Sequence, residues 1–402
     1  MALVSTAAVG AEHERRVCTV GSRPLAAAPQ GETSGPALLG PGLVFLPGAN
    51  AAVACTLPSV ANDYLLEQVL AAEESLGLDV QLSIVFSTVP TGCGNLYYFP
   101  VKNDVRGIGY ASTDQTELFD RAPGWQLQGI AFLNDIPYFE AHADEFRTAF
   151  LHEVGHRFAA RVNALKNGVV YRLTGRQGGH WSYFLDSEAS PLEGNSFDDG
   201  DPTTTTTPHL RLGYSRLDRY LMGLLQPEEV GPIRLLEDAV AEGTDCAGHT
   251  VNATSPPQWC APMTLRGSWV TLSIDDVIAA EGERVVTSGE APTSLSVAVF
   301  VFGAGGEAWS QSSCEWLSRV MPERFDDFAR ATGSRMWLRN AVTSGSSCEI
   351  LTSVDAGSES VLGGGCSLSR RVPRRLSGWA VVVLVSLLAW LRPRSRELWC
   401  AK

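Results

Sequence analysis

The sequence has little positive charge and lacks the patterns that bind a polyanion. Its 31 lysine and arginine residues are outnumbered by 44 aspartate and glutamate residues, which gives a formal net charge of -13 at pH 7. No basic patch with interleaved aromatic residues occurs in the part expected to fold, so we expect no nucleic acid among the partners. Hydrophobic residues make up 45% of the 402 residues and charged residues 19%, so most of the chain should fold.

The sequence also lacks a CxxC pair, although it contains nine cysteines. A zinc site built from thiolates is therefore not expected. Cys246 and Cys260 flank a loop that contains proline, and Cys314 and Cys348 flank a predicted helical segment. We interpret them as disulfide cysteines of an exported protein, with scattered buried thiols as the alternative, and the pairing cannot be deduced from the sequence.

The apolar run near the C-terminus, residues 376–391, is 16 residues long, and a transmembrane helix needs about 20. It follows a GGGC stretch that ends at Cys366 and precedes the basic segment RPRSR. This order resembles the MYXO-CTERM sorting tail of myxobacterial surface proteins, although four arginines separate Cys366 from the run. The resemblance implies export to the outer cell surface. An ordinary C-terminal transmembrane anchor is the alternative, and both place the folded part outside the cytoplasm.

Composition divides the chain into four predicted segments. Residues 1–50 are an irregular leader that has a cleavage-like AVGA stretch but lacks the positive n-region of a signal peptide. Residues 51–343 are the predicted catalytic domain. A Ser/Gly-rich linker (344–372) and the apolar tail (373–402), which would be a sorting signal or a membrane anchor, complete the chain.

The predicted elements before residue 170 suggest an α+β fold. An amphipathic helix over 65–78 precedes three predicted strands, over 80–89, 96–101 and 129–135. A long helix over 144–166 follows, with an apolar residue at every fourth position and Asn167-Gly168 as its stop. Further on we expect a strand and a Ser273/Asp276-capped helix within 269–282, a strand over 295–303, and a helix over 314–333 interrupted at Pro322.

The motif LHEVGHRF, residues 151–158, indicates a metal site. Within a helix, His152 and His156 lie one turn apart on the same side, and two imidazoles at that spacing can hold one zinc ion. Glu153 would act as general base on a zinc-bound water. Gly155 costs about 1 kcal/mol relative to alanine inside a helix. It therefore suggests a close approach by a neighbouring segment.

A catalytic zinc needs a third protein ligand. The extended metzincin motif would have glycine and histidine where this chain has Ala159 and Val162. We favour His180, in the Gly-rich stretch before Trp181, as the third ligand. Asp186 or Glu188 is the alternative, and His180 would then donate a hydrogen bond in the transition state.

Three motifs together resemble those of a set of secreted or surface zinc metalloproteases, many of them myxobacterial. They are HEVGHRF, HWSYFLDSEASPLEGN and YSRLDRYLMGL, and the resemblance covers about residues 129–340. It implies a zincin-like catalytic domain, with the motif helix beside a small mixed sheet, and a zinc-dependent peptidase. The substrates of that family are largely unassigned.

The third motif supplies further candidates. Met222 could lie beneath the metal, Tyr220 or Tyr214 could hydrogen-bond the oxyanion, and Asp218 could orient a ligand histidine. The plainer interpretation makes Tyr220 a residue of the helix core and Asp218 a surface charge.

The sequence as a whole predicts an exported zinc endopeptidase that acts on proteins or peptides and is attached to the cell envelope by its tail. His152, His156 and His180 would bind Zn²⁺, and Glu153 and Tyr220 would be catalytic. A catalytically inactive surface binding or adhesion module on a zincin scaffold is the alternative. A zinc hydrolase acting on a non-peptide amide is a third possibility.

Overall fold

The computed structural model describes most of the chain between residues 36 and 348. The described residues are 36–39, 42–46, 58–89, 96–114, 125–198, 203–205, 212–257, 262–286, 293–303, 309–343 and 348. They lie in one compact unit, Met1–Ser353. The predicted tail and, apart from residue 348, the predicted linker fall outside them. Within the described ranges no helix combines the length and apolar character that crossing a membrane requires.

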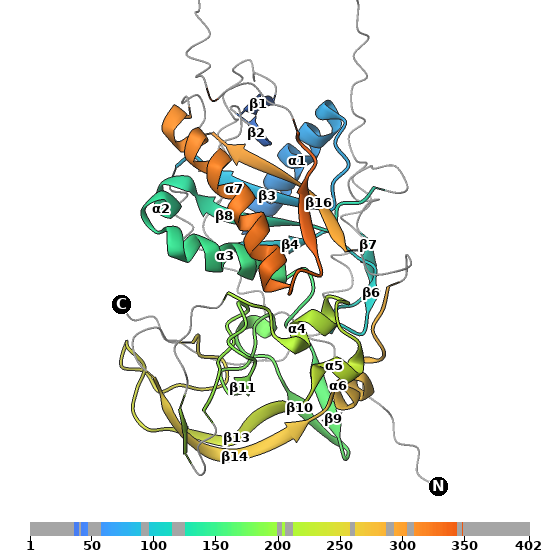
Figure 1. Ribbon diagram of the computed structural model, residues 1–402, viewed down its shortest axis with the longest axis vertical. Helices are drawn as coiled ribbons and strands as arrows, with labels where there is room; N and C mark the ends of the chain where they lie inside the picture. Colours follow the sequence, from blue (N-terminus) through green and yellow to red (C-terminus); the bar gives the residue numbers. More distant parts are fainter. Residues whose placement is uncertain are drawn as a thin grey trace, which may run out of the picture. The chain divides into compact units, whose positions relative to one another are not determined.

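A seven-stranded mixed sheet forms the centre of the fold (Figure 1). The strand order is β1-β2-β16-β3-β8-β4, and β17 also pairs with β16. Neighbours from β2 to β8 are parallel, whereas the outer strands β1 and β4 are antiparallel to their partners. The strands are β1 (Ala37–Leu39), β2 (Leu43–Leu46), β3 (Leu82–Ser87), β4 (Tyr97–Pro100), β8 (Gly129–Asp135), β16 (Ser294–Phe302) and β17 (Trp337–Asn340).

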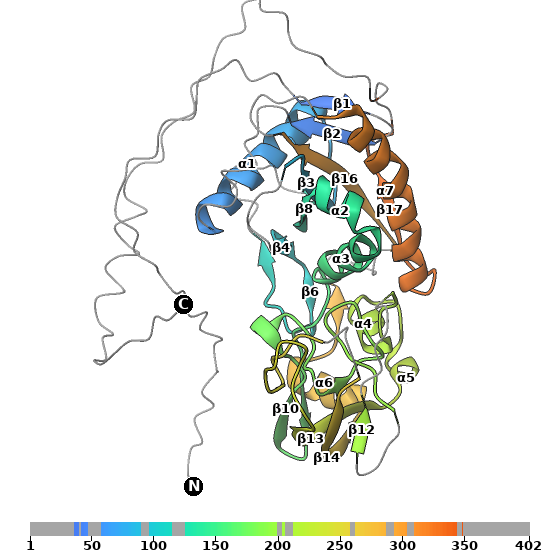
Figure 2. The ribbon, with the colours of Figure 1, turned by 90° about the vertical axis from the view of Figure 1, so that its left-hand side faces the viewer.

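Helices cover both faces of this sheet, so its central strands β2, β16, β3 and β8 bury apolar residues on both sides. Figure 2 shows α1 (Pro58–Leu76) on one side and α2 (Ile136–Ala141), α3 (Ala143–Gly155) and α7 (Gln311–Ala331) on the other. Val44 and Phe300 pack with residues of α1, whereas Leu43 and Val299 pack with residues of the other three helices. This alternation follows from the two-residue repeat of a strand. The α+β prediction is therefore confirmed, with the motif helix beside a mixed sheet.

Two predictions about these elements are wrong. Residues 37–46 belong to the predicted irregular leader, but β1 and β2 come from them and add to the sheet. Helix α7 continues through Pro322 instead of breaking there.

The predicted helix over 144–166 is also wrong in its second half. Helix α3 ends at Gly155, with His156 as its C-cap. Strands β9 (Asn163–Lys166) and β10 (Val169–Arg172) follow and form an antiparallel hairpin. Asn167 and Gly168 have φ of 53° and 79°, as both central residues of a type I′ turn require, so this dipeptide is a hairpin turn and not a helix stop.

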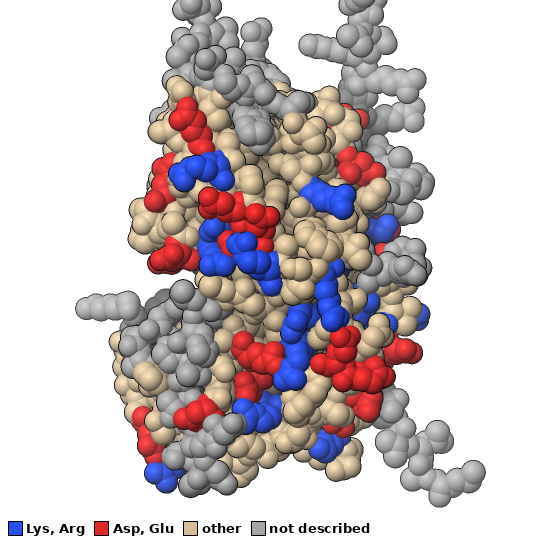
Figure 3. All heavy atoms as spheres, in the orientation of Figure 1, with Lys and Arg blue, Asp and Glu red and all other residues tan. Residues whose placement is uncertain are grey.

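An ion pair joins α3 to α7, and a second pair within α7 shares its carboxylate. On the face shown in Figure 3, acidic and basic side chains lie beside one another. Asp327 of α7 is 2% exposed and pairs with Arg147 of α3 at 2.8 Å and with Arg324 at 3.0 Å. Because a buried carboxylate needs such partners, the contact fixes the helix that carries the histidines.

A second region follows the hairpin. It contains a four-stranded antiparallel sheet in the order β11-β13-β14-β12. Helix α6 packs on β9, and its predicted Ser273/Asp276 capping box is confirmed. The remaining elements are β5 (Lys102–Asn103), β6 (Val105–Arg106), β7 (Thr113–Asp114), β11 (Leu185–Asp186), β12 (Thr203–Thr205), α4 (Arg216–Leu221), α5 (Pro227–Val230), β13 (Ile233–Ala241), β14 (Thr264–Leu272), α6 (Ile274–Glu281) and β15 (Val285–Val286).

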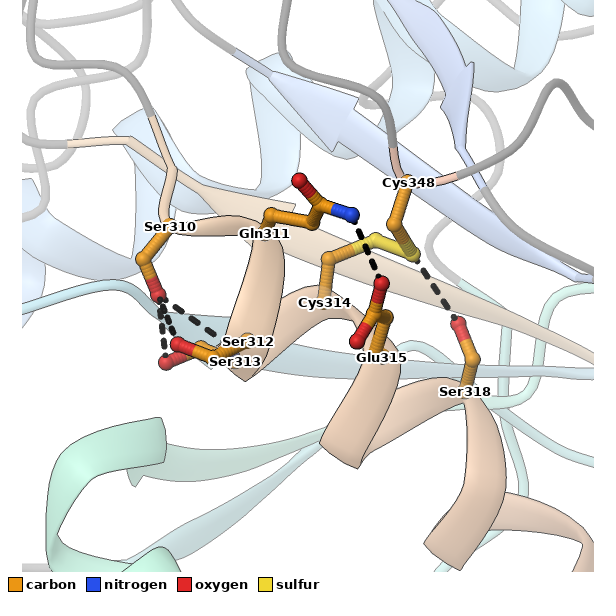
Figure 4. Close-up of a disulfide and its surroundings, with 8 residues drawn as sticks. All are labelled: Ser310, Gln311, Ser312, Ser313, Cys314, Glu315, Ser318 and Cys348. Carbon is orange, nitrogen blue, oxygen red and sulfur yellow. Dashed lines mark hydrogen bonds between the residues drawn. A yellow bond between two sulfur atoms is a disulfide. The ribbon is translucent and has the colours of Figure 1, made fainter.

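A disulfide joins α7 to the segment after β17. Figure 4 shows Cys314, near the start of α7, bonded to Cys348, with the Ser318 hydroxyl 3.7 Å from the Cys348 sulfur. Cys246 is also disulfide-bonded, and Cys260 lies outside the described residues. The prediction of disulfides is confirmed.

Replacing Cys314 and Cys348 together by alanine should lower the free energy of unfolding by about 3–4 kcal/mol, because the bridge closes a loop with a sequence separation of 34. Equilibrium urea unfolding measures the change. Ser318→Ala is the control and should change stability by about 0.5 kcal/mol or less, since it removes only the hydroxyl contact. A double variant as stable as the parent protein would contradict this expectation.

Candidate metal centre

Three histidine side chains from two segments converge. His152 lies in the last turn of α3, His156 caps that helix, and His180 follows a short 3₁₀ turn at Arg176–Gly178. The His152 Nε2 atom lies 3.0 Å from His156 Nε2 and 3.2 Å from His180 Nε2. Their ligand atoms all lie within 4.8 Å of one another, so the three side chains could hold a metal ion.

Hydrogen bonds set the tautomers of two of these rings. The Nδ1 atom of His152 lies 2.8 Å from the carbonyl oxygen of Pro191, and that of His180 lies 2.9 Å from the carbonyl oxygen of Arg176. A carbonyl only accepts, so each Nδ1 carries the hydrogen and each neutral ring has a lone pair on Nε2. Two lone pairs at 3.2 Å repel each other, and a cation between them removes that repulsion.

The spacing of the nitrogens also suits a metal ion. In a tetrahedral site with metal–nitrogen bonds of about 2.0–2.1 Å, the ligand nitrogens lie about 3.3 Å apart. The distances from His152 Nε2 to the other two Nε2 atoms, 3.0 and 3.2 Å, are close to that value. The residues present therefore fit a metal ion with three imidazole ligands. Imidazole suits Zn, Cu, Fe and Ni, so the donor set alone does not choose among them.

The predicted close approach at Gly155 is present. A Cβ atom there would lie 2.9 Å from a ring carbon of Tyr214 and 3.3 Å from a side-chain carbon of Leu192. Leu192 follows Pro191, whose carbonyl oxygen is bonded to His152. The missing side chain therefore lets the 190–195 loop lie against the end of α3, where its carbonyl reaches the histidine.

Glu153 is the buried carboxylate of the centre. Its side chain is 3% exposed, and its Oε1 atom lies 3.9 Å from the Nε2 atom of His152. Its other oxygen, Oε2, is buried without a hydrogen-bond partner among the described residues. Burial raises the pKa of Glu153 well above 4.5, and the charge of Arg176 opposes that rise. A nearby divalent cation would favour the ionised form, which makes Glu153 a candidate proton acceptor.

The histidines are held neutral. Burial lowers the pKa of His152 from 6.5 to about 4 and that of His156 well below 6.5, and the neighbouring imidazoles act in the same direction. Burial also lowers the pKa of His180. A neutral imidazole is the form that binds metal, so the environment favours binding over protonation.

An ion pair that the sequence analysis missed lies beside the centre. The guanidinium of Arg176 donates from Nε to Glu193 at 3.1 Å and also from Nη2. The same carboxylate lies 3.8 Å from His180 Nε2. Burial would raise the pKa of Glu193, but the Arg176 hydrogen bond and the nearby charges lower it below 4.5. No spacing rule links these residues to the motif, because the loop brings them together.

Asp218 is fully buried and organises the surroundings of the histidines. It accepts hydrogen bonds from the Trp181 indole at 2.9 Å, from the Ser215 amide at 2.8 Å, and from the hydroxyls of Ser215 and Ser190. It is therefore not the surface charge of the plainer interpretation. Among the described residues it does not bond to a histidine, so any effect on the orientation of a ligand histidine is indirect.

The hydrogen bonds of Asp218 act indirectly on two of the three candidate metal ligands, His152 and His180. Trp181 follows His180 in the chain, and Ser190 precedes Pro191, whose carbonyl is bonded to His152. The same buried carboxylate thus fixes the backbone beside both rings. Such outer contacts hold ligand rings in their binding orientation.

The other candidates of the third motif have structural surroundings. The Tyr214 hydroxyl donates to the carbonyl of Leu151 at 2.6 Å, which ties it to α3. Tyr220 is buried among apolar residues, and its charged neighbours are Arg284, Glu283 and Asp275. These surroundings give no support to an oxyanion role for its hydroxyl. Met222 is buried in the core cluster that contains Val154.

The alternative third ligands lie apart from the histidine group. Asp186 is bonded to Arg234, and Glu188 is paired with Arg216 at 2.6 Å. Both carboxylates thus have cationic partners of their own. Of the three candidates, His180 is the one that the fold brings to His152 and His156.

We expect the purified protein to bind about one equivalent of a divalent transition-metal ion, and His180→Ala to bind it far more weakly, because two imidazoles then remain. Elemental analysis after dialysis against buffered metal measures the stoichiometry. His142→Ala is the matched control, since His142 is exposed and its Nδ1 is bonded to the Tyr138 carbonyl. Retention of a full equivalent by His180→Ala would show that the histidine is not a ligand.

The metal-free protein should lose stability through His152 as the pH falls from about 6.5 to about 4. The unfolded state takes up the proton near 6.5, whereas the folded state resists it to about 4, so the unfolded state binds more protons in this window. Urea midpoints at pH 7 and pH 5 should therefore differ more for the protein than for His152→Gln. The raised pKa of Glu153 contributes with the opposite sign in both proteins. Equal differences would refute the expectation.

Comparison with known proteins adds no assignment to this geometry. No protein-family model, curated protein or solved structure matches the chain. The motif resemblance to zinc metalloproteases therefore stays a prediction. What is established is a group of three histidines that could bind a metal ion, with a buried glutamate beside it.

Proposed function

We propose that the protein is a zinc-dependent endopeptidase with a zincin-like catalytic domain. The observation that carries the proposal is Glu153, a buried carboxylate with one unpartnered oxygen, next to three converging imidazoles. An uncompensated carboxyl at that position costs stability. Its presence beside a metal-binding group is what acid–base catalysis at such a centre requires.

The chain supplies both the ligands and the proton carrier. His152, His156 and His180 would hold zinc through Nε2. Zinc bound by three imidazoles supplies Lewis-acid chemistry, which polarises a carbonyl and lowers the pKa of a coordinated water to about 7. Glu153 would take a proton from the attacking water on Oε1 or Oε2 and return it to the leaving amine. The hydrogen bonds on the Nδ1 atoms of His152 and His180 keep those rings aimed at the centre.

The edge of the main sheet supports a peptide substrate over a small amide. Strand β4 pairs only with β8 among the described strands, so its other side could add an extended peptide. Tyr97 of β4 lies near the centre: its pKa is raised to about 12, first by burial and then by the charge of Glu153. A peptide on this edge would pass close to the proposed base.

We also propose that the protein acts outside the cytoplasm. The Cys314–Cys348 bridge and the disulfide at Cys246 support this, because disulfides persist in oxidising compartments. Attachment to the envelope rests on the predicted tail alone.

Glu153→Gln should lower kcat for casein or a quenched-fluorescence peptide by about 10²–10⁴-fold, because it removes the proton acceptor. Zinc stoichiometry should stay at about one equivalent, since the substitution leaves all three histidine ligands in place. Glu145→Gln is the matched control: Glu145 lies on the same helix, is exposed and is bonded to the Tyr138 hydroxyl.

Chelator should abolish cleavage by the parent protein and by Glu145→Gln, and added zinc should restore it. Cleavage by Glu153→Gln at the parent rate would rule the mechanism out. A parent protein that binds zinc and cleaves nothing would instead favour the inactive binding module.

A further inference from the structure

Arg176, beside the candidate metal centre, has hydrogen-bond donors that no described residue uses. Its Nε and Nη2 atoms are bonded to Glu193, and Nη1 makes no hydrogen bond to any described residue. The side chain is 42% exposed, so a substrate can reach it. Its charge acts on His152, Glu153 and His180 alike. A half-exposed guanidinium with free N–H groups therefore lies within electrostatic range of both the ligands and the base.

The position of this guanidinium is fixed by its surroundings. The Glu193 oxygen bonded to Nη2 is also the one that lies 3.8 Å from His180 Nε2. The Arg176 carbonyl accepts the hydrogen bond of the His180 ring. Arg176 thus contacts the same histidine through its backbone and, by way of Glu193, through its side chain. These two contacts define where the free donors of Arg176 lie relative to His180.

Glu193 also determines which kind of group Arg176 would bind. Its carboxylate holds the guanidinium through two nitrogens and offsets the positive charge. An acidic substrate side chain near Arg176 would meet the negative charge of Glu193 as well. A carbonyl oxygen, which is neutral and gains charge only during the reaction, suits the free Nη1 donors better than a carboxylate does.

We propose that Arg176, held by Glu193, donates a hydrogen bond from Nη1 to the carbonyl oxygen of the amide that is cleaved. The inference rests on the proposed peptidase function. Hydrolysis adds the oxygen of one water to the carbonyl carbon, and the displaced π electrons reside on the carbonyl oxygen. When the carbonyl re-forms, the C–N bond breaks with its electrons on nitrogen, which takes the proton that Glu153 removed from the water. Arg176 stabilises the oxygen while it carries that charge.

This assignment replaces the tyrosines suggested by the sequence. The hydroxyl of Tyr214 already donates to the Leu151 carbonyl, and Tyr220 lies in an apolar cluster beside Arg284. Neither hydroxyl is available in the way that Nη1 of Arg176 is. The donor for the oxyanion therefore comes from the loop that carries the third histidine.

The test compares Arg176→Gln with the parent protein in the zinc-loaded full chain. Loss of one oxyanion donor costs about 10²–10³-fold in kcat, so kcat should fall by about that factor while KM for a neutral peptide changes little. Arg176→Lys keeps the positive charge but lacks the forked guanidinium, so its kcat should fall less than that of Arg176→Gln. Arg172→Gln is the matched control, because Arg172 is exposed and donates to Thr174. The control should keep the parent kcat.

A second readout does not depend on turnover. A phosphinic peptide carries a tetrahedral phosphinate group, and one of its oxygens stands in for the charged carbonyl oxygen. Its affinity, measured by calorimetry on zinc-loaded protein, should fall in Arg176→Gln by about the same factor as kcat/KM. The affinity of Arg172→Gln should not change.

Three results would overturn the inference. They are an unchanged kcat in Arg176→Gln with intact zinc content, unchanged phosphinic-peptide affinity, or a loss confined to KM for acidic peptides. The first two would leave the peptidase proposal standing if Glu153→Gln is still inactive. A parent protein that does not cleave peptides would overturn the peptidase proposal and this inference together.

Discussion

Two imidazole lone pairs that face each other at 3.2 Å are the constraint on which the rest of the site depends. They arise because the carbonyls of Pro191 and Arg176 each hold the hydrogen on the Nδ1 atom of a histidine. Without a cation the arrangement is repulsive, and burial prevents either ring from relieving it by protonation at neutral pH. The loop after the hairpin must therefore be rigid enough to hold both carbonyls in place. The fold provides that rigidity with hydrogen bonds rather than with apolar packing alone.

Most of this rigidity depends on one buried carboxylate, Asp218. Burial raises its pKa, and the hydrogen bonds from Ser190, Ser215 and Trp181 oppose the rise. A buried carboxylate with that many donors is stable in one arrangement and costly in others, so it selects a single loop conformation. The capping box of α4 uses the same carboxylate, with Ser215 as N-cap. One short helix thus fixes the loop at two points after the third histidine, Trp181 and Ser190.

Sequence patterns predicted the part of the site that lies within and next to a single helix. The histidines of HEVGHRF depend on the four-residue repeat of a helix, and His156 keeps its position although α3 ends one residue before it. The hairpin was missed because Val162 continued an apolar stripe, whereas its burial comes from packing in another cluster. Arg176 and the hydrogen bonds of Asp218 were not predictable either. They depend on loop contacts between residues up to 37 positions apart, for which the sequence contains no periodic signal.

The burial of Glu153 would link stability to the proposed activity of this site. Without a cation, burial raises its pKa and favours the protonated acid, which is a poor base. A divalent ion held by the neighbouring imidazoles would lower that pKa again and restore the ionised form. Arg176 already acts in that direction, but Glu193 offsets its charge, so the arginine alone does not suffice. In the proposed mechanism, the carboxylate would therefore be a competent base only when the histidines hold a metal ion. This dependence would couple the proposed proton transfer to metal binding through electrostatics, with no requirement for a conformational change.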